Sequence, residues 1–189
     1  MTNILEIIMI ICTIIYSYLL IYCNRQAFIF GIISSCIMGY ILLIDGIFIQ
    51  SILYFIYMIM YLYSYFNWGR KDAPRISSMT CKECGISAIY ILIFTLVIGY
   101  IFSAIGEKHP YIDSFSAACS MTAVFLLDKK VIEHAYIFVL ANISAIYVCY
   151  VTHDYVTILT FLVYMIFNLI RAYTWKKELI KINKKDVSI

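Results

Sequence analysis

Gly85 to Ile105 of the chain reads GISAIYILIFTLVIGYIFSAI and contains no charged residue. An α-helix rises about 1.5 Å per residue, so a run of about 20 apolar residues can cross a hydrocarbon core of about 30 Å. The whole chain has this character, because 64% of its residues are hydrophobic and 13% are charged. In soluble domains about 45–50% of the residues are hydrophobic and about 25% are charged. The composition predicts an integral membrane protein and excludes an ordinary soluble fold.

Further apolar runs of similar length are separated by charged residues, glycine or proline. The seven predicted spans are Ile4 to Tyr22, Phe28 to Ile44, Ile47 to Trp68, Gly85 to Ile105, Tyr111 to Leu127, Ala135 to Val151 and Tyr155 to Trp175. The first run begins with Glu6 rather than with lysines and lacks a small-residue cleavage site. It therefore indicates a permanent span and not a signal peptide.

The positions of the basic residues test the number of spans, because Lys and Arg concentrate in cytoplasmic loops. With seven spans and the N-terminus outside, all but two of the 14 Lys and Arg residues fall on the inner side. The exceptions are Lys108, in an outer segment, and Arg171, within the last span one turn from its inner end. The inner basic residues are Arg25, Arg70, Lys71, Arg75, Lys82, Lys129, Lys130, Lys176, Lys177, Lys181, Lys184 and Lys185. We therefore expect a multi-pass protein of the inner (plasma) membrane with a cytoplasmic C-terminus.

The ends of the third and seventh predicted spans match each other at a fixed offset. YMIMYL at Tyr57–Leu62 lies over YMIFNL at Tyr164–Leu169, and Trp68 falls on Trp175. Chance similarity of low-complexity membrane sequence is the alternative explanation. As a repeat, the match predicts an all-α integral membrane fold of seven transmembrane helices in a 3+1+3 parallel arrangement, with a binding site at the repeat interface near the midplane. The predicted boundaries are 1–68 for the first repeat, 69–110 for a cytoplasmic loop and linker helix, 111–175 for the second repeat and 176–189 for a basic tail.

No ionisable side chain lies at the centre of a predicted span; the acidic residues and histidines are at span ends or in loops. Ionisable groups within a bilayer are costly and usually mark ion pathways or functional sites. The sequence therefore predicts that a substrate moves down its gradient by facilitated diffusion, without ion coupling. It also predicts that the protein is not an enzyme, because no base, nucleophile or metal-binding group is available within the spans. Cys81 and Cys84 form a CxxC in the large inner loop, which supplies only half of a tetrahedral zinc site. We expect no metal and no cofactor, and the role of this pair stays open.

Uncharged polar and aromatic side chains do occur within the predicted spans. Tyr57, Tyr61, Tyr164 and Asn168 recur at helical spacing on corresponding repeat positions, which would place them around one cavity. Such a lining suits a flat heteroaromatic ring held by stacking, or a ring cation held by cation–π attraction. The alternative is that these side chains join helices through interhelical hydrogen bonds. Asn142 and Asn168 favour a site most strongly, because an unsatisfied amide in hydrocarbon is expensive.

The same regions carry a set of short motifs in a defined order. They are Pro110-Tyr111-Ile112-Asp113-Ser114, Asp128-Lys129-Lys130-Val131-Ile132-Glu133, Asn142, Asn168, Trp175 with Lys176, and in the first half Phe30-Gly31, Gly39 and Trp68. With these residues the chain resembles the PnuC-type nicotinamide riboside transporters over nearly its whole length. The resemblance implies a seven-helix 3+1+3 fold similar to that of a full-length SWEET transporter, assembled as a homotrimer. It also implies facilitated uptake of a small-molecule vitamin or nucleoside that a cytosolic kinase then traps by phosphorylation.

The chain differs from the family pattern around the expected site. A family WxxW pair before the asparagine of the sixth span reads Ala135 and Phe138 here, and the family's Asn and Gly-Trp near the end of the third span read Tyr61 and Ser64-Tyr65. An upstream family Gln reads Tyr54. The expected substrate-binding residues are Tyr54, Tyr57, Tyr61, Tyr65, Phe138, Asn142, Tyr164 and Asn168.

These departures leave the substrate open among nicotinamide riboside, thiamine, riboflavin and a deoxynucleoside. Two other functions stay open: a SWEET-like sugar carrier, and a non-transporting membrane scaffold subunit whose tyrosines pack helices. A scaffold should have a closed core, whereas a carrier should show a pocket near the midplane that is lined by residues from both repeats. No nucleic-acid partner is expected.

Overall fold

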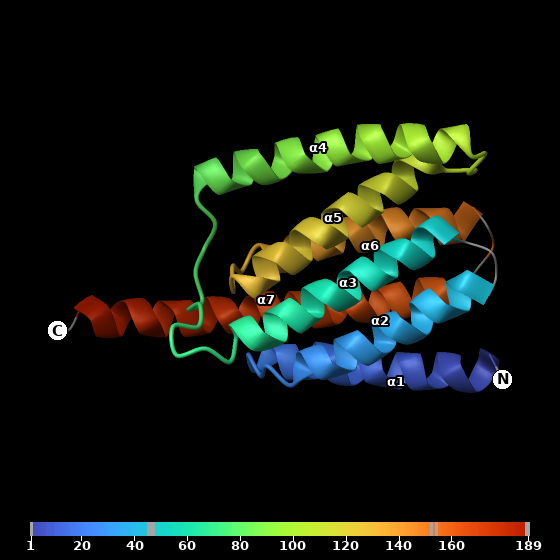
Figure 1. Ribbon diagram of the computed structural model, residues 1–189. Coiled ribbons are helices and arrows are strands. Elements are labelled where there is room, and N and C mark those ends of the chain that lie inside the picture. The colour runs from blue at the N-terminus through green and yellow to red at the C-terminus, as the bar shows by residue number, and fades with distance from the viewer. Residues whose placement is uncertain (1, 45–47, 152, 154, 188–189) are drawn as a thin grey trace. The chain divides into compact units, whose positions relative to one another are not determined.

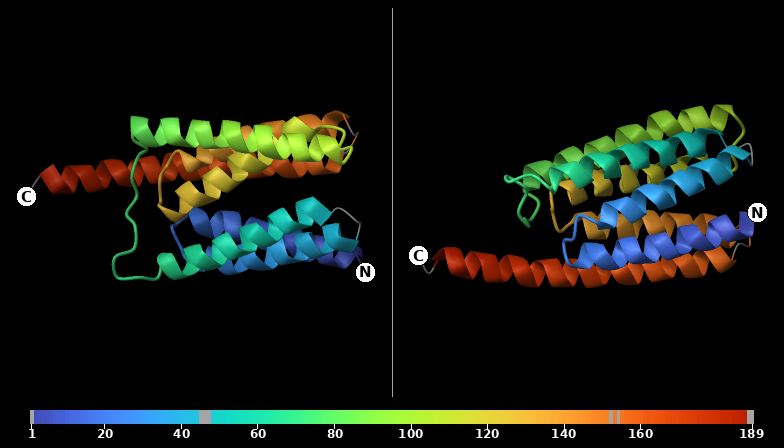
Figure 2. Two further views of the ribbon diagram at one scale, coloured as in Figure 1. Left: turned by 45° about the horizontal axis from the view of Figure 1, so that its top comes forward. Right: turned by 60° about the horizontal axis from the view of Figure 1, so that its bottom comes forward.

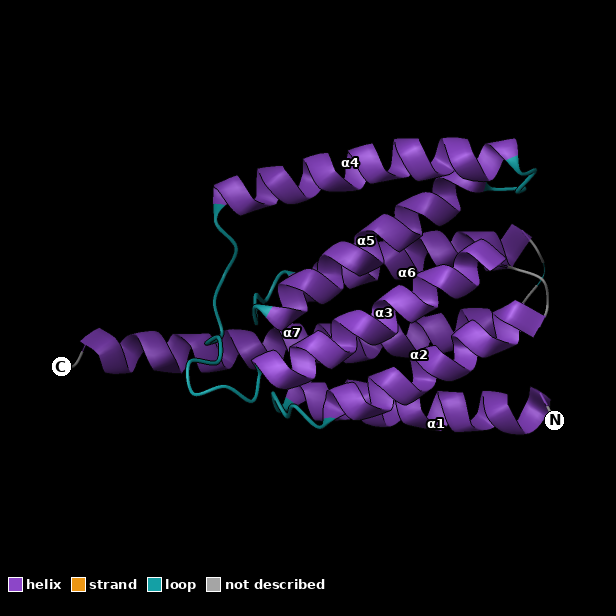
Figure 3. Ribbon diagram, in the orientation of Figure 1, coloured by secondary structure: helices purple, strands orange, loops and turns teal. Residues whose placement is uncertain are grey.

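The computed structural model describes residues 2–44, 48–151, 153 and 155–187, and their regular elements are all helices (Figure 3). The helices, labelled in Figure 1, are α1 (Thr2–Ile21), α2 (Ala27–Ile44), α3 (Phe48–Asn67), α4 (Cys81–Ala104), α5 (Pro110–Asp128), α6 (His134–Val151) and α7 (Tyr155–Val187). Each predicted span falls on one of these helices, apart from Ile47 at the start of the third span, which lies outside the described residues. In the described part of the chain, six helices are long and apolar enough to cross a membrane, and the tyrosine-rich α3 is not among the six. The prediction of an all-helical membrane protein is confirmed.

Helix α4 begins four residues before the predicted span because its first turn is capped. The Thr80 hydroxyl accepts a hydrogen bond from the Glu83 backbone N–H at 3.3 Å, and the Glu83 carboxylate accepts one from the Thr80 backbone N–H at 2.9 Å. This reciprocal capping box satisfies two of the backbone donors that a helix start leaves unpaired. Cys81 and Cys84 therefore lie in the first turn of α4, and the prediction that they lie in a loop is wrong.

The chain forms two compact units, residues 1–74 and 75–189. In the first unit α1 packs on α2 and α2 on α3. Its core is aromatic: the ring of Tyr61 lies 5.2 Å from that of Tyr16, and the ring of Phe28 lies 4.8 Å from that of Trp68. Gly31 permits this packing, because a Cβ atom there would come within 3.1 Å of the Tyr16 and Tyr61 rings.

In the second unit α4 packs on α5, α5 on α6 and α6 on α7. Small side chains on α5, including the fully buried Ala118 and Ala123, allow close packing. The Ser116 hydroxyl donates a 3.1 Å hydrogen bond to the Ala141 carbonyl of α6. Gly99 of α4 allows the approach of Tyr111, because a Cβ at Gly99 would clash with the Tyr111 ring.

The segment before α4 is tied to the connection between α5 and α6. Ser77 exchanges backbone hydrogen bonds with that connection, donating to the Lys130 carbonyl at 3.1 Å and accepting from the Ile132 N–H at 3.0 Å. The Glu133 carboxylate accepts bonds from the Ser78 hydroxyl at 2.5 Å and from the Met79 backbone N–H at 2.8 Å. Glu133, which closes one of the family motifs, therefore holds the polypeptide that leads into α4.

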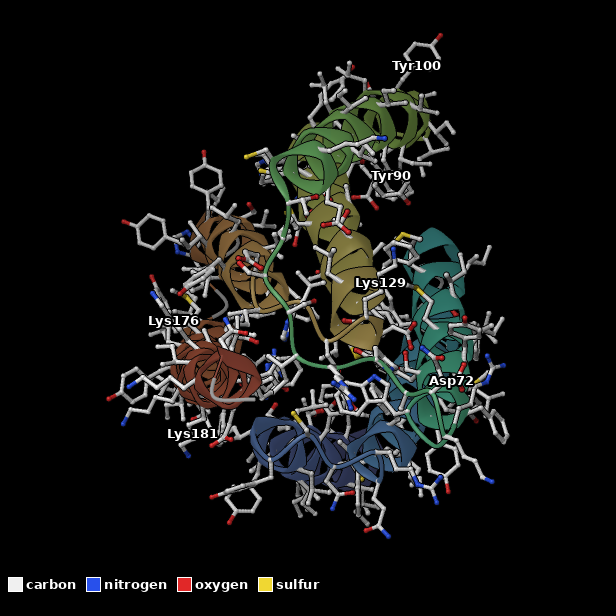
Figure 4. The ribbon with its side chains drawn as sticks, turned by 90° about the vertical axis from the view of Figure 1, so that its left-hand side faces the viewer. Asp72, Tyr90, Tyr100, Lys129, Lys176 and Lys181 are labelled. Carbon is white, nitrogen blue, oxygen red and sulfur yellow. The ribbon has the colours of Figure 1, made fainter. Side chains whose placement is uncertain are left out.

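Helix α7 continues beyond the predicted span, so that the described part of the basic tail is helical through Val187. This part of α7 extends past the ends of α5 and α6 (Figure 2). Exposed lysines of this part include Lys176, Lys177, Lys181 and Lys184. Lys181 projects from the helix and pairs with Glu178 at 2.6 Å (Figure 4). At the other edge of the unit Tyr100 projects outward from α4 (Figure 4).

Candidate functional site

Helices α6 and α7 hold between them a group of polar and aromatic side chains, buried except for the half-buried Phe138, which we call the α6–α7 cluster. Its members are His134, Phe138 and Asn142 on α6, and Asn168, Arg171 and Trp175 on α7. Residues three, four or seven positions apart share one face of a helix, so each set of three forms one stripe. Because α6 packs directly on α7, the two stripes meet inside the second unit.

Arg171 connects the two stripes. Its side chain is 2% exposed, its Nη2 atom donates a hydrogen bond to the Asn168 Oδ1 atom, and its Cζ atom lies 5.8 Å from the centre of the Phe138 ring. A guanidinium has donors and no acceptor, so the bond requires the Asn168 amide oxygen to face Arg171. The Asn168 amide nitrogen is therefore the part of that side chain that points elsewhere.

His134 closes one end of the cluster. Its ring is fully buried, lies 4.9 Å from the Trp175 ring, and makes an edge contact with Phe138 at 6.2 Å. The Nδ1 atom is 2.6 Å from the Val131 carbonyl, which only accepts, so Nδ1 carries the proton. The lone pair of the neutral ring is then on Nε2, which is buried and has no hydrogen-bond partner among the described residues.

Asn142 lies one turn after Phe138 on α6 and is 8% exposed. Its Nδ2 atom is buried and has no hydrogen-bond partner in the described part of the chain. Leaving such a group unpaired costs about 1–3 kcal/mol, and most buried polar groups in proteins do have a partner. A ligand that accepts a hydrogen bond would satisfy this amide.

Of the expected substrate-binding residues, Phe138 and Asn168 both contact Arg171, and Asn142 lies one turn after Phe138 on α6. Tyr164 lies on α7 one turn before Asn168, with its ring 6.3 Å from that of Phe161. The remaining expected residues, Tyr54, Tyr57, Tyr61 and Tyr65, all lie on α3 in the first unit.

The tyrosines of α3 contact other aromatic or cationic groups of their own unit. Tyr61 packs on Tyr16 and also lies 6.3 Å from Phe28, ring to ring. Tyr54 and Tyr57 make an edge contact at 5.7 Å, and the Arg25 guanidinium lies 5.4 Å from the centre of the Tyr65 ring. Within the first unit these residues contribute to packing.

Three members of the cluster were not expected from the sequence: Arg171, His134 and Trp175. The sequence placed Arg171 near the inner end of its span, His134 at a span end or in a loop, and Trp175 at the end of the last span, but the structure buries all three. Their spacing relative to Phe138 and Asn168 was the available signal, because it puts each of them on the same helix face as an expected residue.

Metal ligands do not gather in the described residues, where no three His, Cys, Asp or Glu side chains form a group able to hold an ion. The thiols of Cys81 and Cys84 are free and exposed at the start of α4. The chemistry of the cluster is therefore that of hydrogen bonding, ring stacking and one buried cation.

A family model described as nicotinamide mononucleotide transporter matches residues 3–177. The chain belongs to this family. Among solved structures it is similar to one titled "Crystal structure of the Vitamin B3 transporter PnuC", with a TM-score of 0.75 and 15% sequence identity, over 92% of this chain and 80% of that one. No curated protein matches the sequence. The resemblance seen in the sequence motifs is confirmed, and this member of the nicotinamide mononucleotide transporter family shares its fold with the solved transporter.

Proposed function

We propose that this protein mediates facilitated uptake of nicotinamide riboside, or of a similar ring-bearing vitamin or nucleoside, across the inner membrane. Family membership supports transport, and the solved structure of the same fold is titled as a vitamin B3 transporter. The observation within this chain that carries the proposal is the buried amide nitrogen of Asn142 in the α6–α7 cluster, which finds no hydrogen-bond partner in the described part of the chain. A packing scaffold gains nothing from such a group, whereas a carrier can satisfy it with substrate.

In this proposal Phe138 offers its face to the substrate ring, and the amides of Asn142 and Asn168 bind polar substituents. The protein has the 3+1+3 arrangement of a SWEET-like carrier, assembles as a homotrimer, and has its N-terminus outside and its C-terminus in the cytoplasm. Movement follows the substrate gradient, and phosphorylation by a cytosolic kinase keeps the substrate inside.

Uptake into liposomes that contain the purified protein tests the proposal. Labelled nicotinamide riboside, thiamine, riboflavin, deoxynucleosides and a sugar are presented in turn, with protein-free liposomes as the control. We expect saturable uptake of at least one ring-bearing compound, up to equal concentrations on both sides. Uptake of the sugar alone would indicate a sugar carrier, and uptake of nothing on the panel would favour a scaffold.

The absence of ion coupling is tested with the same liposomes. An imposed proton or sodium gradient should leave the final internal substrate concentration unchanged when no kinase is enclosed. Enclosing a kinase and ATP should raise the total internal label above the external concentration. Gradient-driven accumulation without a kinase would contradict facilitated diffusion.

A further inference from the structure

Arg171 is a buried cation within the group of residues to which we assign substrate binding. Its guanidinium contacts Asn168 through a hydrogen bond and faces the ring of Phe138. A guanidinium stays charged in proteins, and it binds planar carboxylates and phosphates with strong, charge-assisted hydrogen bonds. This residue therefore affects which substituent a substrate can place in the cluster.

Asn168 and Asn142 can offer hydrogen-bond donors to a substrate. For Asn168 this follows from its hydrogen bond with Arg171. The Asn168 oxygen accepts from Arg171, so its amide nitrogen remains for another partner. The Asn142 amide nitrogen is also without a partner among the described residues. Both amides thus present donors, and the substituent that matches them is an acceptor-rich group such as a carboxylate.

The Arg171 guanidinium lies over the Phe138 ring, and its charge affects which substrate rings can bind there. A cationic ring is attracted to an aromatic face, but here the guanidinium already lies 5.8 Å from the centre of that ring. Two positive charges a few ångströms apart repel each other, and the repulsion is stronger inside a protein than in water. A ring with a carboxylate carries less net positive charge and also supplies an acceptor.

We propose that Arg171 is a specificity-determining residue, which makes the α6–α7 cluster select a riboside whose ring carries a carboxylate over the matched carboxamide. The inference rests on the proposed function, because it requires that the cluster bind the substrate. It goes beyond that function by naming the substituent that is recognised and the residue that recognises it.

The experiment compares two ribosides that differ only at this substituent, nicotinic acid riboside and nicotinamide riboside. Their dissociation constants are measured by calorimetry on the purified full-length protein, at a pH where the carboxylate is ionised. We expect the wild-type protein to bind the carboxylate form at least about tenfold more tightly. Arg171→Gln should reduce this preference to less than about threefold, because an uncharged amide cannot discriminate by charge. Arg171→Lys should retain part of the preference.

Two further variants control for charge and for folding. Lys177→Gln removes an exposed charge from the same helix, outside the cluster, and should keep the wild-type preference. Asn168→Asp places a carboxylate beside Arg171 without changing the size of the side chain. It should abolish the preference for the anionic riboside even if Arg171→Gln does not fold.

The possible results separate the inference from the proposed function. If the wild-type protein transports and binds the carboxamide as tightly as the carboxylate, the inference is overturned and the proposed function stands. An unchanged preference in folded Arg171→Gln also overturns the inference. If neither riboside binds or enters liposomes while another ring-bearing compound does, the inference fails and the function narrows to that compound. If nothing on the panel enters, both fail.

Discussion

The two units of this protein carry a tryptophan at matching positions of α3 and α7, and the space around it is filled differently. Trp68 at the end of α3 and Trp175 on α7 are both buried, and each contacts a ring on the preceding helix, Phe28 in the first unit and His134 in the second. At the offset that relates Trp68 to Trp175, the other paired positions are Gly31 with Phe138, Ser35 with Asn142, Tyr61 with Asn168 and Ser64 with Arg171.

This pairing places amides and a guanidinium in the second unit where the first unit has small residues and a tyrosine. In the first unit Tyr61 packs against Tyr16 across Gly31, a contact between apolar surfaces. In the second unit the corresponding region holds a hydrogen-bonded Arg171 and Asn168. Similar helix patterns therefore support two different interiors, and we expect substitutions in the first to affect stability and those in the second to affect binding.

The largest expected effect is on the aromatic interior of the first unit. Trp68→Ala removes a buried ring that packs against Phe28, and should lower the free energy of unfolding by about 3–5 kcal/mol. Thermal unfolding in detergent measures this loss. Phe66→Ala, at an exposed position of the same helix, should change it little. Equal losses from the two variants would contradict the aromatic core.

Asn142→Ala should have its effect on binding, since the Asn142 amide nitrogen has no hydrogen-bond partner to lose among the described residues. Substrate affinity should weaken by about 1–3 kcal/mol, the cost of leaving a buried polar partner unpaired, at nearly unchanged melting temperature. Ser35→Ala makes the matching change in the first unit and should leave affinity unchanged. A large loss of melting temperature with normal affinity in Asn142→Ala would instead assign this residue to helix packing.

Phe138→Ala distinguishes ring-bearing substrates from others. If Phe138 stacks on the substrate ring, its loss should weaken binding by about 1–3 kcal/mol, by analogy with bases stacked on aromatic side chains. Binding of a sugar should hardly change. Phe125→Ala, at an exposed position of α5, is the matched control. Calorimetry with each ligand gives both values, and an equal effect on the sugar would exclude stacking as the role of Phe138.

The smallest expected effect concerns the segment that leads into α4. Glu133→Gln weakens two charge-assisted hydrogen bonds, to Ser78 and to Met79, and should lower the stability of the second unit by about 1 kcal/mol. Protease cleavage near Met79 should become faster. Glu178→Gln, which removes an exposed pair with Lys181, should cost about 0–0.5 kcal/mol. Similar rates of cleavage in both variants would show that Glu133 does not hold this segment.

Much of the fold could be predicted from the sequence, because the length and polarity of a helix that faces lipid are local properties. All seven predicted spans fall on helices. The early start of α4 was also open to prediction, since Thr80 and Glu83 have the spacing of a capping box. The motifs that indicated the family lie mostly in the second unit and were sufficient to identify it.

The candidate site was predictable only in part. Asn142, Asn168 and Phe138 follow from the depth of the polar groups and the family pattern, and their role in binding stays a prediction; the structure places them on the neighbouring helices α6 and α7. The burial of Arg171, His134 and Trp175 in this cluster could not be predicted in the same way. Hydropathy gives the depth of a residue in the membrane and not the direction in which its side chain points. A long side chain near a span end can reach the interface or turn inward, and the sequence alone permits both.

The sequence by itself determined that this is a helical membrane protein of a transporter family, since those properties depend on local composition and short motifs. Only the tertiary structure decided that Arg171 turns inward, bonds Asn168 and faces Phe138. The physical reason is that a charged side chain is stable inside a protein only where surrounding side chains supply its partners. Asn168 lies on the same helix as Arg171, but Phe138 is far away along the chain and meets Arg171 only when α6 packs on α7.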